Sequence, residues 1–283
     1  MGQMISINPS EKESYTLDSD LIKHLDKVKN LLREQWMVLF IIVSRGKPGS
    51  GKSTLAAQMC KYVDPLFDLD QCVFTGQDLK ETCERIGQER HRFAIQFDEA
   101  KTIFNKKRQL SDHYIELDNY MEAVRKVSPF ICFCTPNLFD LPKTYISKCE
   151  AVINVIWKDD TKNNTRKRGY FDIFGDQKSL KLYKKGRDWE DYNAVIPDFE
   201  SLGFNKYVPF DWNTYQAKKD KARKDLDMIK KTYSARADKT SRIVFWLCDQ
   251  KGFKPKELSQ VSGYSLKHIY NLIERGKKIE IET

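Results

Sequence analysis

Eight residues near the start of the chain have the composition and spacing of a phosphate-binding loop. The run Gly46-Lys-Pro-Gly-Ser-Gly-Lys52-Ser53 matches the pattern G-x-x-x-x-G-K followed by Ser or Thr at each specified position. In that pattern the glycines let backbone N–H groups approach an anion, the lysine reaches the β- and γ-phosphates, and the serine hydroxyl ligates Mg²⁺. ATP and Mg²⁺ are therefore the expected ligands. The residues expected to contact the nucleotide are Gly46, Pro48, Gly49, Ser50, Gly51, Lys52, Ser53 and Thr54.

Two adjacent carboxylates, Asp98 and Glu99, follow a mostly apolar run that begins at Arg92. Such a run is typical of a buried strand, and its carboxyl end lies beside the neighbouring phosphate loop in a parallel sheet. We expect Asp98 to hold Mg²⁺ together with Ser53, and Glu99 to deprotonate the water that attacks the γ-phosphate. Many strands end in solvated acids, so the run alone is a weak signal. Its position 46 residues after Lys52 strengthens it, because one further strand and two helices fit between.

A second polar tip follows the apolar run of residues 129–134. Thr135 and Asn137 come directly after this run and flank Pro136. Either side chain could hydrogen-bond the attacking water or the γ-phosphate from a strand that lies between those of the two motifs. The alternative is that Thr-Pro-Asn only forms the turn at which the strand ends. We favour the functional role and count both residues as catalytic candidates.

Regular elements must position these groups. The apolar, β-branched run Met37–Val43 indicates a buried strand before the loop, and Thr54–Val63 indicates the helix after it. A helix is also expected from Asp18 or Ser19. Its apolar face would carry Leu21, Leu25, Val28, Leu31 and Leu32. Further strands are expected over residues 71–75, 92–97, 129–134 and 151–157, and further helices over residues 78–86 and 114–127.

Four other segments carry weaker signals. Residues 1–17 are polar and are expected to form a loose arm, and residues 158–168 a charged loop that could line a DNA channel. Residues 169–183 alternate on both sides of Gly175-Asp176, which predicts a β-hairpin with its turn at that dipeptide. Residues 186–212 are aromatic and punctuated by proline, and are expected to wrap the core.

The composition bounds the class of protein. A chain of 283 residues is long enough for one large domain or two ordinary ones. Its seven cysteines are odd in number and show neither a C-x-x-C pair nor metal-ligand spacing, which predicts reduced core thiols. No signal peptide opens the sequence, and the apolar run around Trp36–Val43 is too short to span a bilayer. We therefore expect a cytoplasmic protein without a membrane span.

The positive charge is concentrated in the last third of the chain. Residues 201–283 hold 18 Lys and Arg against 10 Asp and Glu, whereas residues 1–200 hold 31 against 30. This excess is consistent with a solvated lysine-rich helix or with contact to nucleic acid.

The same region predicts a charged helical arm over residues 214–237, followed by a small helical module. Its helices are expected over residues 241–252, 254–261 and 265–275, and the glycine-containing turn between the last two is typical of a helix-turn-helix. The expected core residues are Leu258, Val261, Ile269 and Leu272. The residues expected to face DNA are Ser265, Lys267, His268 and Asn271. The alternative is a helical lid without DNA contact, and the basic charge favours DNA.

The order of the motifs resembles that of P-loop ATPases that carry an additional central strand and a catalytic glutamate. This group includes AAA+, RecA-like and FtsK/HerA-type motors. The resemblance is greatest to the FtsK/HerA side, which includes viral packaging and conjugation motors. It lies in the Asp98-Glu99 segment, a helix bearing Arg125, and the strands ending at Asn137 and Trp157. The resemblance covers about half the chain, residues 35–185. Many FtsK/HerA-type proteins carry glutamine where this chain has Asn137, and this difference leaves an AAA+ assignment open. Unlike the phage-assembly relatives, this chain has no transmembrane span.

The resemblance implies a homo-oligomeric ring in which an arginine of one subunit contacts the γ-phosphate held by the next. Arg125 is the first candidate, because it lies on the helix that enters the polar-tipped strand. Arg108 is the second, and Arg166 or Arg168 the third.

These expectations define one architecture: an α/β fold with the parallel-sheet core of a P-loop NTPase, helices on both faces, and an all-α helix-turn-helix module. The expected domains are an ATPase over residues 1–212, a helical linker over 213–237 and the module over 238–283. The implied function is a DNA-stimulated ATPase that translocates, packages or transfers viral or plasmid DNA, with a replication or packaging protein as a further partner. Two alternatives stay open: an AAA+ replication initiator or helicase loader, and a DNA-binding regulator switched by ATP.

Overall fold

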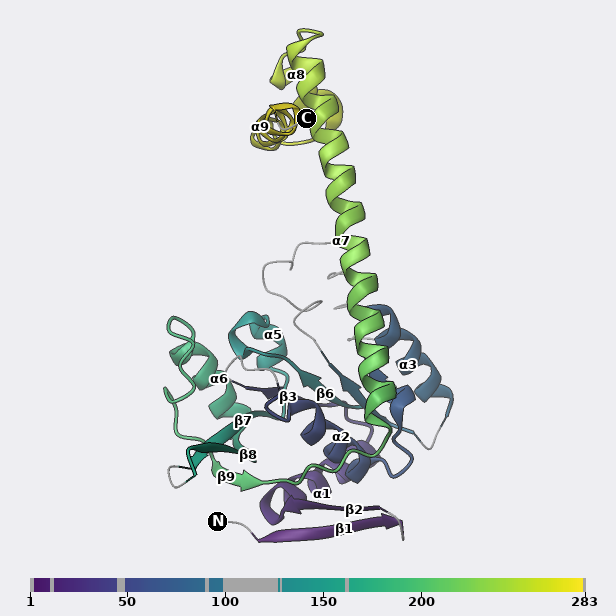
Figure 1. Cartoon of the computed structure of the whole chain (residues 1–283), viewed down its shortest axis with the longest axis vertical. Helices are drawn as coiled ribbons and strands as arrows, with labels where there is room; N and C mark the ends of the chain where they lie inside the picture. Colours follow the sequence, from purple (N-terminus) through teal and green to yellow (C-terminus); the bar gives the residue numbers. More distant parts are fainter. Residues whose placement is uncertain are drawn as a thin grey trace. The chain divides into compact units, whose positions relative to one another are not determined.

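The computed structural model describes residues 3–10, 13–44, 49–89, 92–98, 127, 129–160 and 163–281. The chain divides into two compact units, Met1–Gln216 and Ala217–Thr283 (Figure 1). The helix α7 (Trp212–Asp249) begins in the first unit and ends in the second. The separate helices predicted over 214–237 and 241–252 are thus one helix. No proline or glycine lies between Asn213 and Lys251 to interrupt it.

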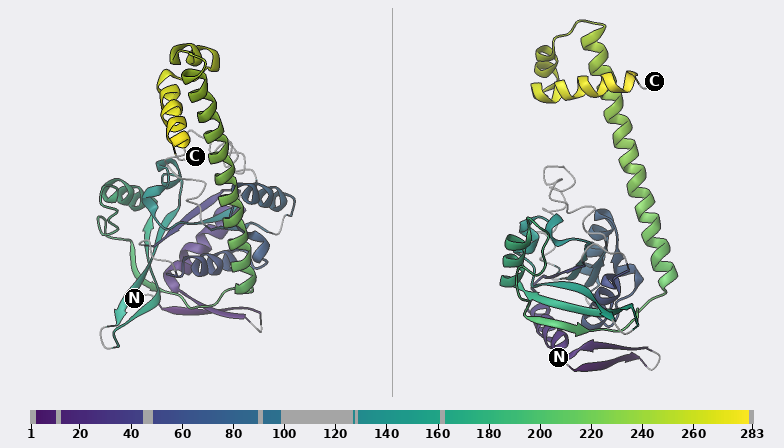
Figure 2. Two further views of the ribbon diagram at one scale, coloured as in Figure 1. Left: turned by 45° about the horizontal axis from the view of Figure 1, so that its top comes forward. Right: turned by 60° about the vertical axis from the view of Figure 1, so that its left-hand side comes forward.

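A seven-stranded sheet forms the centre of the first unit, in the order β4-β5-β6-β3-β7-β8-β9. These strands are β4 (Cys72–Val73), β5 (Ala94–Phe97), β6 (Phe130–Cys134), β3 (Val38–Val43), β7 (Ala151–Asp160), β8 (Thr165–Gly175) and β9 (Phe199–Gly203). Neighbouring strands from β4 to β7 run parallel, whereas β8 and β9 extend the sheet as antiparallel strands (Figure 2). The prediction of an α/β fold with a parallel core is confirmed.

Helices cover both faces of this sheet. They are α1 (Ser19–Arg33), α2 (Lys52–Val63), α3 (Gly76–Gln88), α5 (Lys143–Ile146) and α6 (Asp176–Gly186), with 3-10 turns η1 (Leu69–Gln71) and η5 (Leu138–Asp140). On one face Leu39, Ile41 and Val43 of β3 join a buried cluster with side chains of α3, α5 and α6. Successive strand residues point to opposite faces. On the other face α2 packs on β3, β5 and β6, and α1 contacts α2, β3 and β9.

The helix predicted from Asp18 or Ser19 is present as α1. The Asp18 carboxylate caps it by accepting a hydrogen bond from the Asp20 N–H at 2.9 Å. Leu21, Leu25 and Val28 are buried, as the period of their spacing predicts. The helix predicted over residues 114–127 lies outside the described residues, apart from Val127.

The first residues form a hairpin, and the prediction of a loose arm is wrong. Strands β1 (Met4–Ser10) and β2 (Glu13–Asp18) pair antiparallel. Tyr15 and Leu17 are fully buried, and the Tyr15 ring stacks on Tyr207 with 5.1 Å between centroids. Their alternation with polar residues is a strand signal of period two, which the polar composition of the segment obscures.

The predicted hairpin at Gly175-Asp176 is also wrong, because β8 ends at Gly175 and α6 begins at Asp176. The buried residues of α6 follow helical spacing: Ser179, Leu182, Tyr183 and Gly186. On one side β8 pairs with β7, and residues 158–160 pair with residues 165–167 of the charged segment that was predicted to be a loop. Of the aromatic segment 186–212, Tyr192 and Phe204 are buried as expected, whereas Trp189 is 89% exposed.

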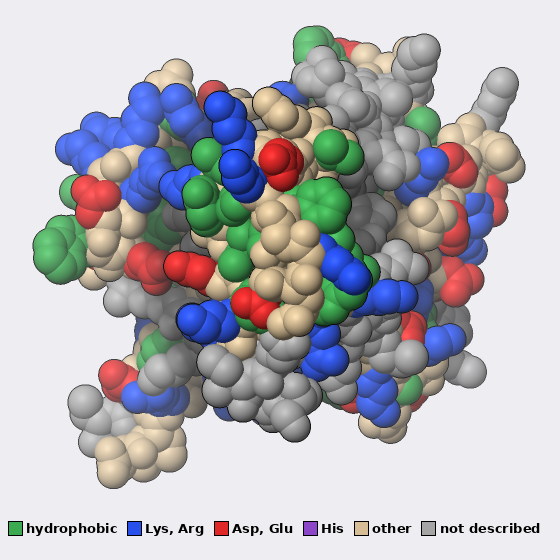
Figure 3. Space-filling model, turned by 90° about the horizontal axis from the view of Figure 1, so that it is seen from above, with side chains coloured by type: hydrophobic (Ala, Val, Ile, Leu, Met, Phe, Trp, Pro, Cys, Tyr) green, Lys and Arg blue, Asp and Glu red, His purple; other side chains and the backbone are tan. Residues whose placement is uncertain are grey.

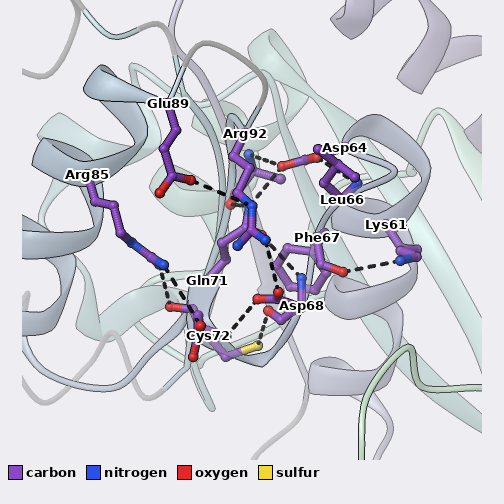
Figure 4. A network of polar contacts seen from close by, with 12 residues as sticks. Lys61, Asp64, Leu66, Phe67, Asp68, Gln71, Cys72, Arg85, Glu89 and Arg92 are labelled. Carbon is purple, nitrogen blue, oxygen red and sulfur yellow. Dashed lines mark hydrogen bonds and ion pairs between the residues drawn. The ribbon is translucent and has the colours of Figure 1, made fainter.

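A buried carboxylate, Asp64, ties the end of α2 to the start of β5 (Figure 4). Its Oδ2 accepts a hydrogen bond from Gln71 Nε2 at 2.8 Å. The same oxygen accepts from the backbone N–H groups of Phe93 and Ala94 at 3.0 and 3.2 Å. Oδ1 accepts from the N–H of Leu66 at 3.0 Å. Since β5 leads to the acidic motif, this carboxylate holds the motif strand against the helix of the glycine loop.

Asp64→Ala is expected to lower the free energy of unfolding by about 3 kcal/mol or more, because it leaves several buried donors unpaired. Urea unfolding followed by circular dichroism measures this loss. Asp70→Ala is the matched control: its exposed carboxylate lies 3.9 Å from Arg85, and a surface ion pair of this kind contributes about 0–1 kcal/mol. Equal losses in the two variants contradict the role of Asp64.

The second unit packs α8 (Pro255–Ser262) and α9 (Leu266–Ile281) against the last part of α7. Its core contains Val244, Ile269 and Leu272, with Leu258 partly buried against them. Three of the four predicted core residues are therefore placed correctly, but Val261 is 88% exposed. Val261 follows Leu258 by three residues, and on a helix this spacing places the two side chains about 60° apart around the helix axis. In the eight-residue α8, which packs on one side, this rotation leaves Val261 in solvent.

The cysteines agree with the prediction of reduced thiols. All seven are free: six are buried and Cys248 is half-buried. Burial raises the pKa of the Cys83 and Cys149 thiols to about 12. In the part of the chain that the structure describes, no helix combines the length and hydropathy needed to cross a bilayer.

Candidate nucleotide site

The glycine loop leads from β3 into α2, as its pattern predicts. Residues 45–48, which include Gly46 and Pro48, lie outside the described residues. Gly49 and Gly51 have φ angles of 72° and 105°, in the left-handed region that favours glycine. Gly51 is the N-cap of α2 and makes no side-chain capping bond. The first N–H groups of a helix lack intrahelical acceptors, so this end of α2 is suited to an anion.

The Lys52 ammonium lies at the carboxyl end of β3. It donates to Ser44 Oγ at 2.8 Å and to Ser50 Oγ at 3.4 Å. Both serines are buried, so these contacts hold the cation over the loop rather than in solvent. Thr54, the last residue predicted to contact the nucleotide, lies in the first turn of α2.

The two sequence motifs meet through Ser53 and Asp98. Ser53 Oγ donates to Asp98 Oδ2 at 3.0 Å, and Asp98 is buried at the end of β5. Adjacent ligands of an octahedral Mg²⁺ also lie about 3.0 Å apart, since each oxygen is about 2.1 Å from the metal. A hydroxyl and a carboxylate at this separation therefore fit Mg²⁺ that is also bound by phosphates. Among the described residues, no group of three or more His, Cys, Asp or Glu forms an alternative metal site.

The strand order completes the assignment of the fold. β6 lies between β3, which precedes the glycine loop, and β5, which precedes Asp98. The polar-tipped strand thus has the central position on which its predicted role depends. This is a P-loop NTPase fold.

Tyr215, in the first turn of α7, is a member of the site that the sequence analysis missed. Its hydroxyl donates to Asp98 Oδ2 and accepts from Gln96 Nε2 at 3.3 Å. The residue is fully buried. Burial, and after it the neighbouring carboxylate, raise the pKa of Tyr215 well above its usual value, so the phenol keeps its proton. The contact spans 117 residues, and no local pattern signals it.

The tip of β6 carries both predicted polar residues. The N–H of Thr135 donates to Ile42 O on β3 at 3.0 Å, and the Thr135 side chain is buried. Asn137 caps η5: its Oδ1 accepts from the Phe139 N–H and the Tyr192 hydroxyl, both at 3.2 Å. The side-chain carbonyl of Asn137 thus has a structural role. The group of this side chain that could contact water or phosphate is its amide nitrogen. Their catalytic roles stay predictions.

Several predicted catalytic residues lie outside the described part of the chain. These are Glu99, Arg108 and Arg125. Of the remaining finger candidates, Arg166 pairs with Asp159 at 3.3 Å and lies over the Trp157 ring.

Arg168 lies beside the glycine loop of its own chain. Its Nη1 is 3.5 Å from the position that a Cβ on Gly49 would take. A Cβ on Gly51 would approach the Phe204 ring to 2.9 Å, so Phe204 covers the other glycine. Arg168 of β8 and Phe204, which follows β9, thus border the loop.

No family model matches the chain, and no curated protein matches its sequence. Solved structures similar to the chain include the genome packaging NTPase B204 of Sulfolobus turreted icosahedral virus 2 in complex with AMPPCP. The TM-score is 0.32 and the identity 15%, over 50% of this chain and 93% of that one. The same NTPase in complex with ATP-gammaS gives a TM-score of 0.33 at 16% identity, over 49% and 92% of the two chains.

The N-terminal domain of zonular occludens toxin from Neisseria meningitidis is similar to the same degree. Its TM-score is 0.34 at 16% identity, over 49% of this chain and 84% of that one. Similarities this slight carry no argument about function. The assignment of the site rests on the strand order and on the contacts of Lys52, Ser53 and Asp98.

Proposed function

We propose that this chain binds ATP with Mg²⁺ at the glycine loop, hydrolyses it, and uses hydrolysis to translocate, package or transfer DNA. The observation that supports this most is the meeting of Lys52, Ser53 and Asp98 at one end of the sheet. A cation, a hydroxyl and a carboxylate lie there beside a helix N-terminus, which is where a bound triphosphate needs them.

Each residue has a distinct role in this proposal. Lys52 leaves its serine partners to bind the β- and γ-phosphate oxygens, and Ser53 with Asp98 holds Mg²⁺. Bound there, Mg²⁺ neutralises charge on the phosphate oxygens. Glu99 follows Asp98 directly and takes the proton of the attacking water. The Thr135 hydroxyl or the Asn137 amide orients that water from the central strand.

The proposal includes a homo-oligomeric ring, in which an arginine of one subunit reaches the γ-phosphate held by its neighbour. Arg125 remains the first candidate for that role and Arg108 the second. Arg168, beside the loop of its own chain, is assigned to phosphate binding within the subunit.

DNA is proposed to contact the second unit along α9. Ser265, Lys267, His268 and Asn271 are all exposed. They lie around the first turns of the helix that follows the Gly263 turn, where Gly263 has a φ of 73°. Recognition helices of helix-turn-helix proteins present their N-terminal residues to base edges in the same way. The basic excess of residues 201–283 supplies the sequence-independent attraction to phosphate.

Basic side chains also occur elsewhere, so the DNA face needs a matched control. Lys and Arg gather at the upper left of the surface in Figure 3. In the first unit, α6 carries the exposed Lys181, Lys184 and Lys185.

The test is a titration of labelled duplex DNA, followed by anisotropy at two salt concentrations, with full-length protein. Replacing Ser265, Lys267, His268 and Asn271 by alanine is expected to weaken binding at least about tenfold. The slope of log affinity against log salt concentration should also become shallower by about one, because one lysine contact to phosphate is lost. Replacing Lys181, Lys184 and Lys185 by alanine should change affinity less than threefold. If only the α6 variant loses DNA affinity, the assignment of the DNA face to α9 is contradicted and DNA binds the first unit.

A further inference from the structure

Tyr215 joins the start of α7 to the carboxylate that the nucleotide site uses for its metal. The residue lies in the first turn of α7, which Asp211 caps by accepting from the N–H and hydroxyl of Thr214, both at 2.7 Å. From this turn the Tyr215 side chain reaches Asp98 Oδ2, the same oxygen that accepts from Ser53 Oγ. One carboxylate oxygen therefore connects the glycine loop, β5 and α7.

The direction of this contact is set by Gln96. The Gln96 side chain is fully buried on β5, and its Nε2 donates to the Tyr215 hydroxyl at 3.3 Å and to the Ser53 carbonyl at 3.2 Å. Because the phenol oxygen accepts from this amide, its own proton is free to point toward Asp98. An amide donor cannot act as the acceptor for that proton.

Aromatic packing fixes the Tyr215 ring. Phe210 and Trp212 stack on it with centroid distances of 5.3 and 4.9 Å, and Phe74 lies tilted at 5.4 Å. Phe74 follows β4, next to β5 in the sheet, whereas the other two precede or begin α7. The ring thus has little freedom to leave the carboxylate unless the first turn of α7 moves with it.

We infer that Tyr215 is a positioning residue for the metal carboxylate Asp98 and that, through it, the first turn of α7 responds to Mg²⁺ binding. This inference rests on the proposed function, since it requires Asp98 to hold Mg²⁺ with a nucleotide. A hydrogen-bond donor to a ligating carboxylate orients the ligand, and its removal costs about 10- to 100-fold in metal affinity. Coupling is reciprocal, so Mg²⁺ stabilises the contact between α7 and Asp98 by the same factor.

The test uses full-length protein with ATPγS and compares Tyr215→Phe with Tyr183→Phe. Tyr183 is a matched control, because its buried hydroxyl donates to Leu141 O at 2.9 Å, a contact that involves neither the glycine loop nor Asp98. In the parent and in Tyr183→Phe, Mg²⁺ should strengthen nucleotide binding and slow hydrogen exchange in peptides covering residues 210–220. In Tyr215→Phe, the Mg²⁺ concentration at half-saturation should rise at least about tenfold. The slowing of hydrogen exchange by Mg²⁺ should be lost. Binding of ATPγS in EDTA should stay within about twofold of the parent.

An unchanged Mg²⁺ dependence in folded Tyr215→Phe overturns the inference and leaves the proposed function intact. An equal change in Tyr183→Phe also overturns it, because the effect is then general loosening of the core. If the parent itself shows no Mg²⁺-dependent nucleotide binding, the proposed function fails and the inference fails with it.

Discussion

Replacing Lys52 by alanine is expected to weaken ATP binding by on the order of 100-fold or more, since truncating one partner of a hydrogen-bonded charge pair costs about 2–5 kcal/mol. Lys52 is the first residue of α2, and its ammonium is already held over the loop by Ser44 and Ser50. Alanine is a strong helix former, so α2 should still form. The loss should therefore appear in nucleotide affinity and leave the fold intact.

Isothermal titration of ATP in the presence of Mg²⁺ measures this effect. Lys61→Ala provides the control: it removes a lysine of the same helix, whose Nζ donates to Phe67 O at 3.3 Å. The control should bind ATP within about threefold of the parent, because Lys61 lies in the last turn of α2, away from the loop. Affinity of Lys52→Ala within a few-fold of the parent contradicts the assignment of the loop.

Glu99→Gln is expected to keep ATP bound and to slow its hydrolysis by on the order of 10²–10⁴, the typical contribution of a general base. The amide preserves the size of the side chain but cannot take a proton from water. Asp98, the preceding residue, lies at the end of β5 within hydrogen-bond distance of Ser53.

Single-turnover hydrolysis with bound ATP separates the two properties. Glu89→Gln is a suitable control, because Glu89 is an exposed acid whose carboxylate lies 3.6 Å from Arg92 on the surface. It should turn over ATP at the parent rate. If Glu99→Gln does the same, the general base is another residue.

The elements around the nucleotide motifs could be predicted because their signals are local. The glycine loop, the apolar run of β3 and the apolar run before Asp98 each lie within about ten residues. The central position of β6 followed from the resemblance to additional-strand ATPases. Ser53 and Asp98 could be paired because parallel strands bring their carboxyl ends to one edge of a sheet.

The remaining features depend on long-range packing. Tyr215 reaches Asp98 across 117 residues, and it sits in a stretch where many aromatic residues have the same local character. The turn at Gly175-Asp176 was misassigned because alternation in β8 continues by chance into α6, whose buried residues follow a period of 3.6 instead. In residues 1–17, buried Tyr15 and Leu17 were outweighed by polar neighbours. The hairpin error thus arose where two periods competed, and the error in residues 1–17 arose where composition outweighed periodicity.

The most direct test of the proposed function is the rate of phosphate release from ATP by the full-length chain, with Mg²⁺ and with or without duplex DNA. We predict hydrolysis that requires Mg²⁺, that duplex DNA accelerates, and that Glu99→Gln slows by on the order of 10²–10⁴. Absence of phosphate release under all of these conditions, in a protein that is folded and binds ATP, would contradict the assignment of an ATP-hydrolysing DNA motor.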